Sequence, residues 1–244
     1  MMPSLSRTAG RHAVIDRREG QYLCFPDVIR AADGRLIVAY NEADQHVTPS
    51  RRALLVAESF DQGRTWSAPR RLDTPRSHCP RLVRLGGELL IADASRTFHR
   101  SADNGVTWVP HPVTGIEHDM LDRPLDLGGG ALLTTGHMHR GRAAQPAIRQ
   151  APAEQMVYRS EDGGRSWYPL SVMARERNLV LCEGSMLRLP DGSIAALLRE
   201  NSFVYEPMHL CLSDDEGETW SDPTPTPLIG HRPTLGLTSA GDLL

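Results

Sequence analysis

The sequence contains no lysine, so all 27 of its basic residues are arginine. Every fixed positive charge is therefore a planar guanidinium, which can bind a carboxylate through two parallel hydrogen bonds. The 30 acidic residues slightly outnumber the arginines, which leaves a formal net charge of −3 at pH 7. This balance argues against nucleic acid or an anionic membrane surface as the partner.

Cysteines and long apolar runs are also scarce. The four cysteines (Cys24, Cys79, Cys182 and Cys211) have neither the spacing of a zinc motif nor that of a disulfide framework. No run of about 18 apolar residues could form a membrane-spanning helix, and the first twenty residues lack the apolar core of a signal peptide. We therefore predict no metal, no cofactor and no membrane partner. The location is predicted to be cytoplasmic, or secreted if an upstream signal was lost.

What the sequence does contain is one eight-residue motif, Ser-x-Asp-x-Gly-x-Ser/Thr-Trp, in four copies. The copies begin at Ser59, Ser101, Ser160 and Ser213, and they hold all four tryptophans. An aspartate in a tight loop can accept hydrogen bonds from the backbone N–H groups that follow it, and the glycine supplies a position with positive φ. The tryptophan is expected to begin the next strand. The four aspartates are therefore interpreted as turn-forming residues: Asp61, Asp103, Asp162 and Asp215.

A second pattern precedes each copy of the motif. Residues 25–40, 79–93, 123–136 and 183–199 each read as two apolar runs joined by a glycine-containing turn, and a fifth such segment begins at 232. This is the signal of a β-hairpin. A further strand is expected before each motif, at 53–59, 97–101, 155–160 and 208–213. Four antiparallel strands per unit, repeated every 40–60 residues or so, predict an all-β propeller.

The repeated motif resembles the Asp box of the sialidase (neuraminidase) superfamily, whose members are six-bladed β-propellers. The resemblance covers roughly residues 20–244. It implies four blades and part of a fifth, because Leu243 and Leu244 fall in the second strand of the fifth hairpin. On this reading the chain is a truncated product or fragment, and residues 1–19 are a separate segment that could close the last blade.

Strand parity predicts where functional residues gather. The tight turns and the Asp boxes share one end of the blades, so the longer connections share the other end, around the axis. Polar residues before the first strands are Ser77, His78, Asp122, Arg123, Glu183 and Arg232. Those after the second strands are Asn41, Glu42, Asp44, Asp93, Arg96, His137, Arg199 and Glu200. A funnel of arginine, histidine and carboxylate side chains predicts an anionic or sugar-like ligand.

The resemblance also implies roles for some of these residues. Sialidases bind the substrate carboxylate with three arginines, use a tyrosine nucleophile that a glutamate activates, and use an aspartate as acid and base. Residues 182–199 are similar to the segment that carries the activating glutamate and one arginine, which implies Glu183 and Arg199. Further candidates for substrate binding are Arg232, Arg123, Arg96, His78 and His137.

Other parts of the chain depart from the family pattern. Cys24-Phe25-Pro26 stands where sialidases have Arg-Ile-Pro, so one arginine of the cluster is missing. The loop 47–58 lacks the acid/base aspartate, which leaves Asp44 as the nearest substitute. The nucleophilic tyrosine and the third arginine are expected near or beyond residue 244. Two weaker readings are Tyr205–Glu206 as a substitute pair and His137 with His139 as metal ligands without a third partner.

The sequence thus predicts a glycoside hydrolase of the sialidase superfamily, one that cleaves a terminal sialic-acid-like or other acidic sugar at the propeller axis. Two alternatives stay open: a non-catalytic carbohydrate-binding propeller, and a related propeller enzyme such as a polysaccharide lyase. If the last blade holds the nucleophile, the chain of 244 residues is expected to be inactive by itself.

Overall fold

The computed structural model describes residues 12–46, 49–74, 76–118, 121–139, 153–175, 179–201 and 206–243. Within these ranges all sixteen regular elements are β-strands, arranged as four antiparallel sheets of four strands each. No helix in this part of the chain is long and apolar enough to cross a membrane.

The sheets follow the order of the chain. The first contains β1 (Tyr22–Arg30), β2 (Leu36–Ala43), β3 (Arg52–Ser59) and β4 (Arg70–Leu72). The second contains β5 (Arg81–Leu85), β6 (Glu88–Ala92), β7 (Thr97–Ser101) and β8 (Val109–Pro112). The third contains β9 (Leu125–Gly128), β10 (Ala131–His139), β11 (Ala153–Ser160) and β12 (Tyr168–Ala174). The fourth contains β13 (Leu181–Arg188), β14 (Ile194–Glu200), β15 (His209–Ser213) and β16 (Thr224–Pro225).

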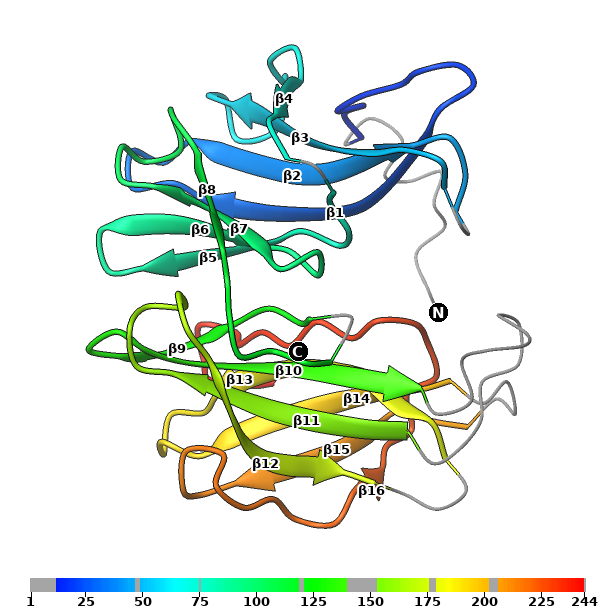
Figure 1. The fold of residues 1–244 in the computed structure, drawn as a ribbon, viewed down its shortest axis with the longest axis vertical. Helices are drawn as coiled ribbons and strands as arrows, with labels where there is room; N and C mark the ends of the chain where they lie inside the picture. The colour runs from blue at the N-terminus through cyan, green and yellow to red at the C-terminus, as the bar shows by residue number, and fades with distance from the viewer. Residues whose placement is uncertain are drawn as a thin grey trace.

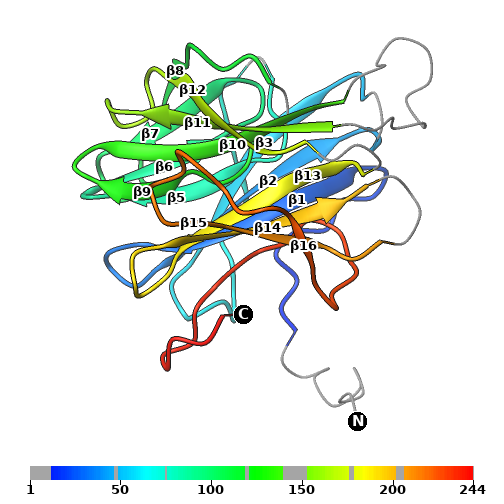
Figure 2. The same ribbon diagram turned by 90° about the horizontal axis from the view of Figure 1, so that it is seen from below.

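Each sheet is one blade of a β-propeller. Consecutive blades meet through their first strands, since β1 contacts β5, β5 contacts β9, and β9 contacts β13. Figure 1 shows the first two blades above the middle of the molecule and the last two below it. Turning the view shows that the strands of all four blades lie roughly along one common axis, in alternating directions, with the tight turns at left (Figure 2). The predicted propeller is therefore confirmed, while a total of six blades stays a prediction.

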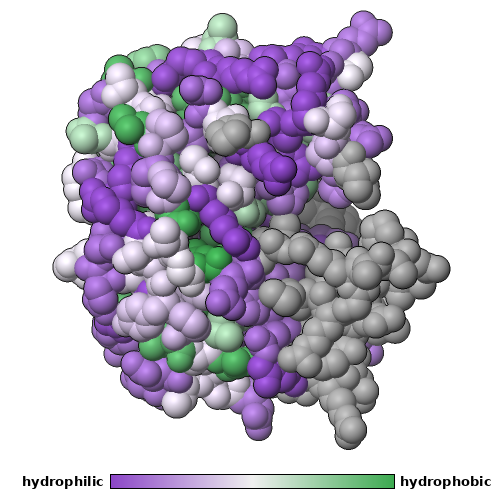
Figure 3. Space-filling model, viewed as in Figure 1, coloured by the Kyte–Doolittle hydropathy of each residue, from purple (hydrophilic) through white to green (hydrophobic). Residues whose placement is uncertain are grey.

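The apolar core lies between neighbouring blades. One cluster joins the second and third blades through Phe98, Leu132 and Tyr158, and another joins the third and fourth through Leu133 and Leu198. Strand β14 is buried at every residue, as expected for the second strand of a blade that is covered on both faces. On the face seen in Figure 3, by contrast, hydrophilic residues cover much of the surface and apolar residues form small separate spots.

The Asp boxes form the same turn in all four blades. In the second blade, Asp103 Oδ1 accepts the backbone N–H of Thr107 at 2.8 Å and Oδ2 accepts the Thr107 hydroxyl at 2.5 Å. The Ser101 hydroxyl donates to the same carboxylate and accepts the backbone N–H of Gly105. These bonds hold the pKa of Asp103 down at about 2, and they leave the carboxylate no spare role in catalysis. The structural interpretation of these aspartates is thereby supported, although β4 and β16 begin four residues after their tryptophans rather than at them.

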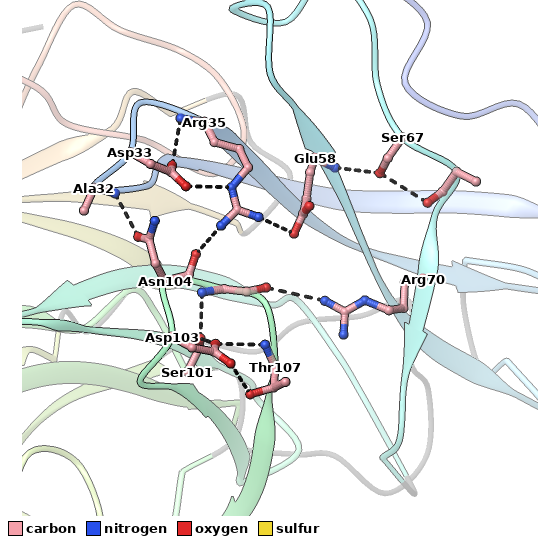
Figure 4. A network of polar contacts seen from close by, with 12 residues as sticks. Ala32, Asp33, Arg35, Glu58, Ser67, Arg70, Ser101, Asp103, Asn104 and Thr107 are labelled. Atoms are coloured by element: carbon pink, nitrogen blue, oxygen red, sulfur yellow. Dashed lines mark hydrogen bonds and ion pairs between the residues drawn. The ribbon is translucent and has the colours of Figure 1, made fainter.

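The second, third and fourth Asp boxes also contact the blade before them. Between the first and second blades, Arg35 on the β1–β2 turn donates to the carbonyl oxygen of Asn104, and the amide oxygen of Asn104 accepts the backbone N–H of Ala32 (Figure 4). Arg70 on β4 reaches the carbonyl oxygen of Gly105 from the other side. The Asp-box end of the propeller is thus a continuous layer of hydrogen-bonded turns.

The two ends of the described chain pack against the blades. Asp16 accepts a hydrogen bond from the hydroxyl of Tyr40 at 2.6 Å, and Arg18 forms an ion pair with Glu42, so this segment lies along β2. Closure of a last blade by residues 1–19 stays a prediction. In the predicted fifth hairpin, Leu237 and Leu243 form an isolated antiparallel bridge around a turn in which Thr238 donates to Asp242.

A glycine at the second–third blade junction tests this packing. Gly115 has a φ of +84°, and a Cβ there would lie 1.7 Å from the carbonyl oxygen of Trp167. We expect Gly115→Ala to lower the free energy of unfolding by about 3 kcal/mol or more, because both the clash and the backbone strain must be relieved. Gly129→Ala is the matched control, since Gly129 also has a positive φ, +65°, but nothing lies within 4 Å of its Cβ position. Its expected cost is about 1 kcal/mol. Equal losses in chemical denaturation would contradict the packing described here.

Candidate functional site

The first strands of the blades begin with an unusual backbone. Four non-glycine residues at equivalent places just before or within these strands have positive φ: Phe25 (56°), Cys79 (53°), Glu183 (48°) and Arg232 (55°). Such a conformation costs a non-glycine residue about 1–3 kcal/mol and tends to occur at functional sites. In β1 and β13 it coincides with a bulge, where the pairing register shifts after Cys24 and after Cys182. These four positions lie at one end of the inner strands, which we call the hub. Three further positive-φ residues, Gln62, Asn104 and Glu216, lie in the Asp-box turns at the other end.

Glu183 and Arg199 form a buried ion pair at the hub. Arg199 Nη1 lies 2.5 Å from Glu183 Oε2, and Arg199 Nη2 donates to the amide oxygen of Asn201 at 2.7 Å. The pairing of β13 with β14 places Cys182 opposite Arg199, which brings the next residue, Glu183, beside the guanidinium. Burial by itself would raise the pKa of Glu183, but the hydrogen bond and charge of Arg199, with help from Arg232 and His137, lower it overall. Glu183 is therefore an ionised carboxylate.

Asp122 is a second hub carboxylate, and its pKa is shifted in the opposite direction from that of Glu183. Its Oδ2 accepts hydrogen bonds from the Thr135 hydroxyl at 2.7 Å, the Gln155 amide at 3.1 Å and the Gly184 backbone N–H at 2.9 Å. Its Oδ1 is buried without a hydrogen bond, 3.5 Å from Arg232 Nη2. Burial raises the pKa of Asp122 to about 6, although Arg232 and Thr135 act against this shift.

Arginines surround these carboxylates. The charge of Arg232 acts on Asp122, Glu183 and the Cys79 thiol, and the pKa of its guanidinium is raised even though burial opposes the shift. Arg81, the first residue of β5, is influenced by Arg232, Asp27 and Asp122, and burial lowers its pKa. Residues from the second, third and fourth blades and from the segment after the fourth thus belong to one electrostatic cluster.

Two further predicted residues join the hub. His137 is buried at the end of β10, and its Nδ1 lies 3.5 Å from the backbone nitrogen of Glu183. Arg123 forms an ion pair with Asp27, whose other carboxylate oxygen accepts the backbone N–H of Leu82. Arg123 thereby joins the third blade to the first.

The remaining candidates make their described contacts elsewhere. The exposed Asp44 accepts the backbone N–H of Ser50 at 3.1 Å and the Ser50 hydroxyl, which lowers its pKa and fixes the loop. Arg96 donates to the carbonyl oxygen of Glu117 at 2.9 Å. His78 contacts Arg52 and stacks edge-on against Phe25, between the first two blades. An acid/base role for Asp44 and substrate binding by Arg96 and His78 stay predictions.

Four hub residues were not chosen from the sequence: Asp122, Thr135, Gln155 and Arg81. The sequence places Asp122 among the polar residues before the first strands, but it assigns no role in the site to this residue. Thr135 and Gln155 lie inside strands whose other residues read as core, so no local signal separates them from packing residues. Arg81 could have been found by aligning the strand starts, because Cys79-Pro80-Arg81 occupies the place of Phe25-Pro26-Asp27.

Among the described residues, no group of three His, Cys, Asp or Glu side chains could hold a metal ion. Metal binding at His137 and His139 stays untested by this, because only His137 of the two has a described side chain. The side chain of His139 and the whole of Tyr205 lie outside the described residues. The tyrosine–glutamate pair proposed at 205–206 therefore stays a prediction.

The hub is a set of buried carboxylates with oppositely shifted pKa values among arginines, built on a bladed propeller. A family model for the BNR repeat-like domain matches residues 89–242, which is more than half of the chain. The protein belongs to this family of BNR repeat-like domains. Among curated protein sequences, none gives a significant match.

Solved structures share the fold at low sequence identity. A protein of unknown function from Dyadobacter fermentans aligns with a TM-score of 0.79 and 18% identity, over 94% of this chain and 76% of the other. An α-L-arabinanase from Penicillium chrysogenum, complexed with arabinobiose, aligns with a TM-score of 0.64 and 17% identity, over 90% of this chain and 68% of the arabinanase. A Hadza microbial sialidase, Hz136, aligns with a TM-score of 0.55 and 21% identity, over 82% of this chain but only 45% of the sialidase. At these identities the likeness shows the propeller fold.

The raised pKa of Asp122 predicts a pH effect on stability. A carboxyl whose pKa is higher in the folded state contributes stability that is fully present below its unfolded pKa, near 4, and is lost as pH rises through about 6. Asp122→Asn keeps a neutral side chain at every pH, so its free energy of unfolding should change less than that of the wild type between pH 4 and 7. The difference should reach at most about 3 kcal/mol. Parallel pH profiles in urea denaturation would show that Asp122 does not titrate in this range.

Proposed function

We propose that this protein is a propeller glycosidase that binds an acidic sugar at the hub and cleaves its glycosidic bond. The observation that carries the proposal is the divergence of two carboxylates in one cluster. Glu183 has a lowered pKa and Asp122 a pKa raised to about 6. A glycosidase needs one carboxylate that carries charge and one group that holds a proton near neutral pH, and unlike environments supply both.

The arginines support an acidic substrate. Arg199 and Arg232 are mostly buried, with side chains 9% and 18% exposed, so a ligand carboxylate that reaches them would meet guanidinium groups already shielded from water. Bidentate arginine–carboxylate hydrogen bonds are strong and geometrically selective. A sialic-acid-like sugar carries such a carboxylate, and a uronic acid would present the same group.

In the proposed reaction Glu183 acts as the charged partner. By resemblance to sialidases it would accept the proton of a nucleophile, and its lowered pKa keeps it ionised for that task. Asp122 fits the proton-carrying role better than Asp44, because an acid works best when its pKa lies near the working pH. Arg232 stands beside Asp122, so its movement toward a ligand carboxylate would further raise the pKa of Asp122.

One observation favours a second candidate, a carbohydrate-binding propeller without catalysis. Arg199 already binds both Glu183 and Asn201, so the pair can be read as a structural element that shapes the hub. A buried ion pair of this kind is compatible with either role.

Replacing Glu183 separates these two candidates. Glu183→Gln keeps an acceptor for Arg199 but removes the charge, so the turnover of a cleavable substrate should fall roughly 10²–10⁴-fold. Release of a fluorophore from a sialoside, a glucuronide and an arabinofuranoside gives the activity and the substrate class. Calorimetry with the uncleaved sugars gives binding.

The control is Glu161→Gln, which removes a carboxylate from the exposed Asp-box end and should leave turnover unchanged. Because the nucleophile is expected near or beyond residue 244, turnover is measured with a protein that includes the remaining blades, and sugar binding without turnover in that protein would support the binding propeller instead. Full turnover by Glu183→Gln, with an unchanged thermal transition, would exclude Glu183 as a catalytic group.

A further inference from the structure

A polar cavity of about 440 Å³ lies between the first and second blades, away from the Asp boxes. Three segments form its walls: the loop after β2 at 49–52, the link before β5 at 76–78, and Ala94 with Ser95 after β6. We call it the arginine pocket, after Arg51, Arg52 and Arg76. The hub chemistry proposed above uses none of these three residues.

The lining of the arginine pocket carries unbalanced positive charge. Among the residues that the structure describes there, it contains three arginines, His78, Ser77 and Ser95, and no aspartate or glutamate. A cavity of about 510 Å³ at the Asp-box end, between the second and third blades, makes a useful comparison. That cavity has two arginines against four carboxylates: Arg100, Arg165, Glu88, Asp126, Glu161 and Asp162. An excess of arginine in the lining is therefore a property of the arginine pocket and not of every space between blades, although Asp44 and Asp93 lie behind its walls.

The walls of the pocket are held from behind by Asp93. Its carboxylate accepts the Ser77 hydroxyl at 2.5 Å, the His78 backbone N–H at 2.9 Å and the Ser95 backbone N–H at 2.8 Å. Asn41 on β2 donates to the Ser77 hydroxyl at 2.7 Å, which ties the first blade to the same point. Two of the three wall segments are thus fixed by buried hydrogen bonds before any ligand arrives.

Arg52 is oriented as well. Its guanidinium lies over the Phe25 ring at 5.5 Å, contacts the His78 ring and donates to the carbonyl oxygen of His46 at 3.2 Å. Its Nε is buried without a hydrogen-bond partner. A group that is already positioned loses less conformational entropy on binding, so it favours recognition of a ligand.

We propose that the arginine pocket binds a negatively charged substituent, a carboxylate or a sulfate group, on a saccharide unit. Planar guanidinium groups suit both oxyanions through paired hydrogen bonds. His78 in the pocket wall directly precedes Cys79, whose thiol is influenced by Arg232 of the hub. An acidic oligosaccharide could then occupy the hub with one unit and the arginine pocket with a neighbouring one. Binding in the pocket does not require catalysis at the hub.

Protection of arginines from chemical modification tests the proposal directly. The full chain is treated with an arginine-selective dicarbonyl reagent, and modification at each arginine is measured by peptide mass spectrometry. The probes are methyl β-D-glucuronide, inorganic sulfate and the neutral methyl β-D-glucoside. We expect the glucuronide or the sulfate to protect Arg52 and Arg76 but not Arg64, which is exposed in the first Asp box.

The probe that protects Arg52 and Arg76 identifies the charged group that the pocket binds. Protection by the glucuronide alone indicates a carboxylate, and protection by sulfate alone indicates a sulfate ester. Protection by neither anion, equal protection by the glucoside, or equal protection of Arg64 would overturn the proposal. Glu183→Gln protein should show the same protection as the wild type, so failure of the proposed catalysis would leave this result unaffected.

Variants give an independent measurement. Arg76→Gln changes an exposed side chain and should weaken binding of the protecting anion roughly tenfold, the expected loss for one charge-assisted hydrogen bond. Arg52→Gln combined with Arg76→Gln should weaken it further, and Arg64→Gln is the charge-matched control with unchanged affinity. Unchanged affinity in Arg76→Gln and in a folded double variant would contradict the assignment.

Discussion

In each Asp box one carboxylate accepts both the backbone N–H and the hydroxyl of the residue four positions later, while the preceding serine bridges to the glycine. The same bonds recur at Asp61, Asp103, Asp162 and Asp215. They close the turn between the third and fourth strands without any help from other blades. Because the turn is fixed, so is the end of the blade to which it belongs, and the longer connections must lie at the opposite end. The position of the hub depends on this constraint.

The two ends of the propeller use charge in different ways. At the Asp-box end, each of the four motif aspartates is satisfied by donors within its own turn, and ion pairs there are formed by glutamates such as Glu58, Glu88 and Glu216. At the hub, charged groups come from different blades, are removed from water, and depend on one another for compensation. Such clusters rarely increase stability, because desolvation offsets the attraction between the charges. Four strained non-glycine residues at the same end add to the cost. Positive φ angles at non-glycine residues also occur in the Asp boxes, at Gln62, Asn104 and Glu216, so the cost that distinguishes the hub is its buried charge. Such a cost is expected where a structure is adapted for binding or chemistry.

The sequence was sufficient to predict the blades because their signals are local. Hairpins and Asp boxes repeat, and their turn residues act over four or five positions. The pairing of Glu183 with Arg199 was also within reach, since both residues belong to one hairpin. The role of Asp122 was harder to predict, because its hydrogen-bond donors lie on β10, on β11 and at Gly184 of the next blade. Its raised pKa arises from complete burial, which only the packed blades produce. The arginine pocket was missed for the same reason, since its walls come from three separate segments of two blades.

At the hub, arginine has a physical advantage over lysine, because it keeps its charge when it is buried. Burial and the charge of Arg232 lower the pKa of Arg81, yet a guanidinium begins near 12.5 and stays protonated in proteins. A lysine in the same setting begins near 10.4, and burial can lower the pKa of its ammonium group to about 5–6. Arginine therefore keeps the hub and the arginine pocket positive throughout the physiological range. The hub group whose raised pKa lies within that range is Asp122, near 6. A change in hub chemistry between pH 5 and 7 should then not come from the arginines that bind the ligand, whereas the proton on Asp122 can contribute to it.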